Sequence, residues 1–182
     1  MNLYILRHAS AGIRRANPLL DVKRPLDKEG KQHCLHLAHV LNALKINFDQ
    51  VISSPLKRAL QTAQLVATET GYEARILHSD ALAPTAEYAE FLHLLDHCSE
   101  RENVLLVGHS PNLPIFLGLL LARTRASAGS TPPPQIRLRK GSLARLTYAR
   151  PNATLQSLVE PRMVRALYST STKSSRRKTS RK

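Results

Sequence analysis

Short apolar runs alternate with segments of helical spacing along most of the chain, and this alternation constrains the fold more than any other feature. The runs are rich in leucine, isoleucine and valine, and they are short enough for strands. They stand at residues 3–6, 48–54, 74–77 and 103–107. The last of them, NVLLV, has no polar position after its first residue, which is typical of a strand buried on both faces.

Helices are expected between these runs. Asp27 can cap a helix whose apolar positions recur every three and four residues, and Pro55 can open another that Gly71 ends. A third helix is predicted over residues 86–98. Strands that alternate with helices form a mostly parallel sheet with helices on both faces, so the sequence predicts a single-domain α/β protein.

The pattern changes near the C-terminus. Residues 141–149 and 153–159 alternate with period two, which predicts antiparallel strands joined by a tight turn. A proline-rich segment at residues 124–135 is expected to be a loop. We therefore predict one domain over residues 1–168 and a disordered basic tail, rich in Ser, Thr, Lys and Arg, over residues 169–182.

The composition sets limits on function. The chain has 182 residues, 42% of them hydrophobic, and a formal net charge of +14, to which the tail contributes six basic residues and no acid. A basic body favours anionic substrates or partners. With no secretory signal, and with Leu113–Ala122 too short to span a bilayer, a cytoplasmic protein is expected. Cys34 and Cys98 lack CxxC spacing and are expected to be buried free thiols.

Chemistry-bearing residues follow three of the predicted strands. Arg7 and His8 follow the first, Ser53 and Ser54 end the second with Arg58 shortly after, and His109 follows NVLLV at residues 103–107. The carboxyl ends of parallel strands share one edge of a sheet, where ligands bind in open α/β folds. An isolated Arg-His pair is most often merely exposed. The convergence of two arginines and two histidines instead predicts a phosphate site without a metal or other cofactor.

At these residues the chain resembles the histidine phosphatase superfamily, which includes the phosphoglycerate mutases and the SixA-type phosphohistidine phosphatases. The resemblance covers about residues 1–161. It is carried, in the family's order, by LYILRHA, RPLDKEGKQ, VISSPLKRALQTA and LLVGHSPNL. The RPL segment, the small size and KGSLARL near the end look most like the SixA branch. Ala9 stands where many members carry glycine, and it removes no catalytic group.

The resemblance implies a phosphoglycerate mutase-like, three-layer α/β/α fold and a covalent phosphohistidine on His8, in a pocket with Arg7, Arg58 and His109. The residues alone do not say which histidine attacks. The pocket arginines would keep His8 neutral and stabilise the transition state. Water would then hydrolyse the intermediate.

An alcohol leaving group needs a proton, and Glu87 is the candidate donor, with Glu90 as the alternative. The structural interpretation of Glu87 is an acid favoured at the start of a helix. Phosphohistidine leaves as an imidazole, whose conjugate acid has a pKa of about 6.5, so it needs much less help than an alkoxide. A weak acid therefore favours a phosphoramidate substrate.

Other polar residues receive mainly structural interpretations. His33, His36 and His39, and the His93, His97 and Cys98 group, lack convincing further metal ligands, so exposed or capping roles are expected. Ser53 and Ser54 can contact phosphate or simply cap the next helix. Arg24 is expected either to make a structural contact or to lie at the rim of the site.

These observations predict a phosphatase that acts on phosphohistidine in a signalling, phosphorelay-type protein. A broad small-molecule phosphomonoesterase is the alternative. A hypothesis from another class is a phosphate- or nucleic-acid-binding module that uses the basic tail at residues 169–182. Because the tail has charge but no aromatics, its contacts with nucleic acid or acidic surfaces would be nonspecific and salt-dependent.

Overall fold

The computed structural model of the protein describes residues 1–123 and 132–168. Within them, six strands form one sheet in the order β3-β2-β4-β1-β5-β6. The first four strands in the chain are parallel to one another. The fifth strand runs antiparallel to the first, and the sixth runs antiparallel to the fifth. The strands are β1 (Asn2–Arg7), β2 (Gln50–Ser53), β3 (Leu77–His78), β4 (Asn103–Gly108), β5 (Leu143–Ala149) and β6 (Asn152–Val159). The predicted parallel sheet with antiparallel strands at its C-terminal side is confirmed.

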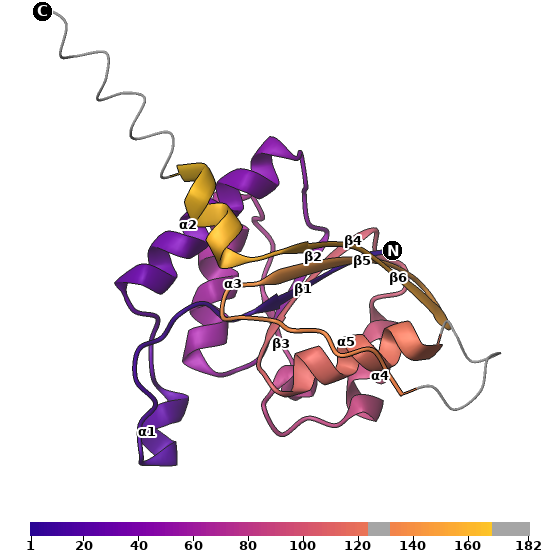
Figure 1. Ribbon diagram of the computed structural model, residues 1–182, viewed down its shortest axis with the longest axis horizontal. Coiled ribbons are helices and arrows are strands. Elements are labelled where there is room, and N and C mark those ends of the chain that lie inside the picture. The colour runs from indigo at the N-terminus through magenta and orange to yellow at the C-terminus, as the bar shows by residue number, and fades with distance from the viewer. Residues whose placement is uncertain (124–131, 169–182) are drawn as a thin grey trace, which may run out of the picture.

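Helices cover both faces of the sheet, as Figure 1 shows. One face carries α2 (Lys28–Ala43) and α3 (Lys57–Glu69), and the other carries α4 (Tyr88–His97) and α5 (Asn112–Arg123). Residues 161–168 form a further helical segment on the α2 side. The chain also has a short helix, α1 (Pro18–Val22), and a 3-10 turn, η1 (Asp80–Leu82). The predicted three-layer α/β/α architecture is therefore confirmed.

Alternate side chains of β1 belong to the two halves of the hydrophobic core, which lie on opposite faces of the sheet. Tyr4 and Leu6 pack with apolar residues of α2 and α3, whereas Leu3 and Ile5 pack with those of α4 and α5. Each of these four side chains is at most 1% exposed. Because side chains of a strand point alternately to opposite faces, a fully apolar strand can lie only between two layers of helices. The sheet is consequently held rigidly from both sides.

The structure differs from the prediction in the start of one helix, in the length of one strand and in the presence of one short helix. The helix expected from Pro55 begins at Lys57, because the Leu56 N–H first bonds the Ser54 hydroxyl at 3.4 Å in a turn. The strand expected at residues 74–77 is the two-residue β3, whose side chains are exposed. Helix α1 was not expected, because it buries none of its residues and so has no apolar periodicity.

Helix α2 begins as predicted, because the Asp27 carboxylate accepts from the Gly30 N–H at 2.7 Å. Cys34 and Cys98 are both buried and free, as expected. None of the helices in the described residues combines the length and the apolar character that crossing a membrane requires. The predicted tail at residues 169–182, and most of the predicted loop at residues 124–135, lie outside the described residues.

Candidate active site

The register of the sheet brings the predicted polar residues to one edge. Strand β1 pairs with β4 so that Arg7 lies opposite Gly108, and the next residues are His8 and His109. The His8 N–H continues the ladder onto the Gly108 carbonyl at 3.0 Å. On the other side of β4, the Ser54 N–H donates to the Val107 carbonyl at 2.9 Å. Backbone hydrogen bonds of the sheet therefore place three separate chain segments around one point.

His8 and His109 form the centre of this site. Their ring centroids are 5.0 Å apart with an interplanar angle of 53°, and the residues are only 6% and 2% exposed. Nδ1 of His8 lies 2.8 Å from the Ala9 carbonyl oxygen. Since a carbonyl oxygen can only accept, Nδ1 carries the proton in the neutral ring and Nε2 keeps its lone pair. The geometry thus presents Nε2 of His8 as a nucleophile.

Electrostatics keep both rings neutral. The pKa of His8 is lowered from 6.5 to about 3, mainly by burial and in addition by the nearby Arg58 and Arg7, against the opposing effect of the hydrogen bond to Ala9. Burial also lowers the pKa of His109 to about 2, with contributions from His8 and from the same arginines. At neutral pH His8 therefore has an available lone pair, which an imidazolium would lack.

The two arginines supply positive charge to the same place. Nη1 of Arg7 donates to the Leu138 carbonyl at 2.7 Å, and Nη1 of Arg58 donates to the Asp21 carbonyl at 3.1 Å. Burial lowers the pKa of both guanidinium groups, but from so high a value that they stay charged at neutral pH. Among the buried nitrogens of the described residues that have no hydrogen-bond partner are Nε of Arg7, Nε of Arg58 and Nδ1 of His109. Buried polar groups normally have partners, so this cluster is suited to an anion.

The two serines divide their roles. The Ser54 hydroxyl lies 2.9 Å from Nε2 of His109 and fixes that ring. The Ser53 hydroxyl donates to the Ser54 carbonyl at 2.9 Å, which gives it a local partner rather than one among the pocket side chains. Both serines are fully buried. Of the two, Ser54 is therefore the one whose hydroxyl contacts a histidine of the site.

Arg24 lies at the rim of the site and makes structural contacts, so both interpretations left open for it apply. Its Nε donates to the Asp21 carboxylate at 2.8 Å, and its Nη1 donates to the Ala11 carbonyl at 2.9 Å. Asp21 in turn reaches Nη1 of Arg58 with Oδ2 at 3.5 Å. Sequence reasoning missed Asp21, although an acid three residues before an arginine is the spacing of a helical ion pair.

An open cleft of about 600 Å³ lies beside this rim rather than over the two histidines. It is lined by residues 11–16 and 24–27. Arg7, His8, Arg58 and His109 are not among the residues that line it.

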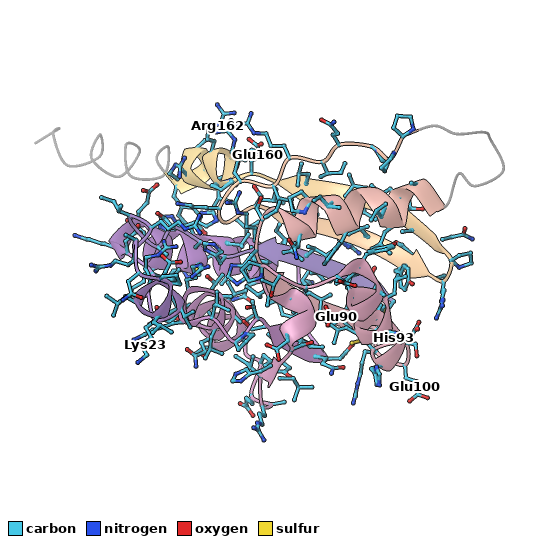
Figure 2. All side chains as sticks on the ribbon, turned by 90° about the horizontal axis from the view of Figure 1, so that it is seen from below. Lys23, Glu90, His93, Glu100, Glu160 and Arg162 are labelled. Atoms are coloured by element: carbon cyan, nitrogen blue, oxygen red, sulfur yellow. The ribbon has the colours of Figure 1, made fainter. Side chains whose placement is uncertain are left out.

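Glu87 is an exposed residue at the N-cap of α4. The loop before it is anchored to α5, because Nδ2 of Asn112 donates to the Ala86 carbonyl at 2.6 Å. Glu90 accepts from the Glu87 N–H at 2.7 Å, which is half of a capping box. Glu90 lies on α4 (Figure 2), and its carboxylate has a structural partner.

The expectation that the α2 histidines are exposed or capping is wrong for His33. This residue is 6% exposed, and its Nε2 donates to the Gly141 carbonyl at 2.8 Å. The reason is that residues distant in sequence pack onto α2, and His36 likewise stacks on Tyr168 with ring centroids 4.1 Å apart. On α4, Nδ1 of His97 bonds the His93 carbonyl at 2.7 Å. The described residues contain no group of three or more possible metal ligands.

Comparisons with known proteins agree with this geometry. The family model of the histidine phosphatase superfamily (branch 1) matches residues 3–83. An uncharacterized protein from Picosynechococcus sp. is 35% identical over 116 residues, which are 62% of this chain and 68% of the relative.

Two solved structures show the fold. The protein histidine phosphatase SixA complexed with tungstate is similar with a TM-score of 0.72 and 24% identity, over 88% of this chain and 97% of SixA. The alpha-ribazole phosphatase from Shigella flexneri has a TM-score of 0.61 and 18% identity, over 88% and 97%. The predicted phosphoglycerate mutase-like fold is thereby confirmed. The chain belongs to the histidine phosphatase superfamily, and its fold is SixA-like.

Proposed function

We propose that the protein is a phosphatase that acts through a covalent phosphohistidine on His8 and that its substrate is phosphohistidine in a signalling protein. Membership of the superfamily supports phosphatase activity. The observation that carries the proposal is the state of His8, which is buried and neutral. Its Nδ1–H donates to the Ala9 carbonyl, so Nε2 keeps the lone pair that attacks phosphorus in the proposed reaction.

The reaction proceeds in two displacements. First, Nε2 of His8 attacks phosphorus, an N–P bond forms, and the bond to the leaving group breaks with its electron pair. Arg7, Arg58 and His109 hold the phosphoryl oxygens and stabilise the charge of the transition state. Water then attacks phosphorus, the N–P bond breaks, and the electron pair returns to Nε2. One proton of that water passes to the phosphate product or to solvent.

The position of Glu87 favours an imidazole leaving group. A general acid must reach the leaving atom directly or through one water, and it works best when its pKa is raised by burial. Glu87 is exposed on a helix cap instead. A phosphohistidine whose second ring nitrogen is protonated leaves as neutral imidazole and needs no such acid. This contrast supports a phosphoramidate over a phosphate ester as the preferred substrate.

A small-molecule phosphomonoesterase is the second candidate. The open cleft of about 600 Å³ beside the site is large enough for a metabolite. The fold is also similar to that of an alpha-ribazole phosphatase. On this alternative, the substrate's phosphoryl group would bind to the same four pocket residues, and Glu87 would have to supply the proton to the leaving alkoxide.

The deciding experiment compares kcat/KM on a phosphorelay domain phosphorylated on histidine with kcat/KM on a panel of small phosphomonoesters. We expect a preference of at least about a hundredfold for phosphohistidine, the smaller end of what a general acid contributes to an alkoxide departure. His8→Asn is the blank, because its amide can still donate to the Ala9 carbonyl but has no atom at Nε2. A preference for an ester would transfer the assignment to the second candidate.

The division into a domain at residues 1–168 and a basic tail at residues 169–182 stays a prediction. Deleting the tail should leave kcat/KM unchanged. A fall in heparin retention at low salt would support a nonspecific binding arm.

A further inference from the structure

A second surface adjoins the phosphate site and is built quite differently. We call residues 13–23, which include α1, the platform. Helix α1 buries none of its residues. Nine large apolar side chains are exposed in the described part of the chain, and four of them lie on the platform. They are Ile13 (90% exposed), Leu19 (77%), Leu20 (56%) and Val22 (48%). Such a concentration marks an interaction surface rather than scattered exposure.

Polar contacts hold the platform in place without any apolar core of its own. Asn17 caps α1 by accepting from the Leu19 N–H at 2.9 Å. The Asp21 carboxylate accepts from the Arg15 N–H at 2.9 Å and from Nε of Arg24 at 2.8 Å. Figure 1 shows α1 standing apart from the other helices. Several hydrogen bonds therefore hold apolar side chains at the surface, where no other part of the described chain covers them.

The platform is joined to the phosphate site through Asp21. The carbonyl and carboxylate of Asp21 both face Nη1 of Arg58, at 3.1 and 3.5 Å. A phosphorylated side chain that reached Arg58 would thus bring the surface around it over the platform. The cleft lined by residues 11–16 and 24–27 lies in the same region.

The charge of the platform selects the kind of surface that fits. Arg14, Arg15 and Lys23 are exposed, and Lys23 points outward from the molecule in Figure 2. The acidic Asp21 is already paired with Arg24, which leaves a net positive face. Complementarity therefore favours a surface with acidic and apolar residues.

We propose that the platform docks a folded protein whose phosphohistidine is bordered by apolar and acidic side chains, so that the partner's surface, and not only its phosphoryl group, selects the substrate. The inference rests on the proposed function and adds its recognition element. A free metabolite is too small to cover both Ile13 and Leu19–Val22 while its phosphoryl group contacts Arg58.

The test uses the double variant L19S/R15E. The Arg15 side chain takes no part in the Asp21 contact, which uses its backbone N–H. The matched control is L44S/K45E, which likewise changes a leucine to serine and a basic residue to glutamate, at exposed residues beyond the C-terminal end of α2 and away from the edge that carries His8. Both are assayed on a phosphorelay domain phosphorylated with phosphoramidate and on free phosphohistidine.

We expect L19S/R15E to lower kcat/KM on the phosphoprotein by about ten- to a hundredfold, mainly through KM, as expected when two central interface residues are lost. On free phosphohistidine it should stay within about twofold of the wild type, which also shows that the variant folds. The control should match the wild type on both substrates.

Two results would overturn the inference. One is equal behaviour of L19S/R15E and the control on the phosphoprotein. The other is a wild-type dimer in sedimentation that L19S/R15E dissociates, because the platform would then be an interface between copies of this chain. If the wild type consumed neither substrate in a His8-dependent way, the proposed function itself would fail, and this outcome is distinct from both.

Discussion

The pocket around His8 and the platform at residues 13–23 differ in almost every physical respect. The pocket is buried, with His8 and His109 at 6% and 2% exposure, and its neutral rings lie among guanidinium groups. The platform is exposed, with Ile13 at 90%. The pocket is positioned by strands paired on both sides, whereas the platform is positioned by a few side-chain hydrogen bonds. This difference shows that the backbone ladder of the sheet positions the pocket residues, whereas side-chain hydrogen bonds at the surface position the platform.

The largest effect is expected from His8→Asn. Turnover should fall by on the order of 10⁴-fold or more on every substrate, because no other atom can form the covalent intermediate. This uniform loss would contrast with the substrate-selective loss expected at the platform. Steady-state rates on the phosphoprotein and on free phosphohistidine provide the measurement. Substantial turnover in the variant would rule out the covalent mechanism.

Arg58→Ala tests the residue at which the two regions meet. Loss of its contacts to the phosphoryl oxygens should lower kcat by about 100- to 1000-fold, equivalent to about 2.7–4 kcal/mol of transition-state stabilisation. Because Asp21 also loses one of its two arginine partners and keeps only Arg24, KM for the phosphoprotein should rise more than KM for free phosphohistidine. Equal changes in the two KM values would show that Arg58 serves the pocket alone.

Acidification should lower the free energy of unfolding through the buried histidines of the pocket. The folded pKa of His8 is about 3, below the unfolded value of 6.5, so between these values the unfolded chain binds more protons. Stability is therefore present above pH 6.5 and is lost as the pH falls. Between pH 7 and pH 5 the free energy of unfolding should fall by about 2 kcal/mol for each of His8 and His109.

Urea unfolding at the two pH values measures this loss, to which His33 also contributes because burial lowers its pKa. His8→Asn should remove only the part that His8 contributes, about 2 kcal/mol. The interval lies above the ordinary pKa of aspartate, and Asp21, whose pKa is lowered to about 2 chiefly by Arg24, stays charged throughout. An unchanged unfolding free energy would show that the histidines are protonated in the folded protein.

The smallest effect is expected from Glu87→Gln, which lies in neither region. On phosphohistidine, kcat/KM should change by less than about threefold, because neutral imidazole departs without a proton donor. Glu90→Gln is the control for the shared helix cap. A loss of about a hundredfold or more with Glu87→Gln alone would instead identify a general acid and favour an ester substrate.

The sequence was sufficient to predict the sheet and the convergence of polar residues at one of its edges. Apolar runs such as residues 103–107 are buried on both faces, and polar residues placed directly after parallel strands must meet at one edge. Arg7, His8, Arg58 and His109 could therefore be assigned together. In each case a local signal and the general geometry of α/β sheets point to the same position.

The features that could not be predicted depend on contacts distant in sequence or on the absence of burial. His33 is buried because its partner, Gly141, is 108 residues away. The tie between Asp21 and Arg58 spans 37 residues. Helix α1 has five residues and no buried side. Periodicity reports only helices that bury one face, so the platform gives no such signal.

The pairing of β1 has a consequence for biosynthesis. This strand is synthesised before both of its neighbours in the sheet, because Asn2 pairs with Asn103 on one side and Leu3 pairs with Leu146 on the other. The carbonyls of Arg7 and His8 also receive the Gly141 N–H, at 3.0 and 3.1 Å. A nascent chain on the ribosome that has not reached β5 thus contains His8 without the strands that position it. Phosphatase activity is therefore expected to appear only once nearly all of the described chain has been translated.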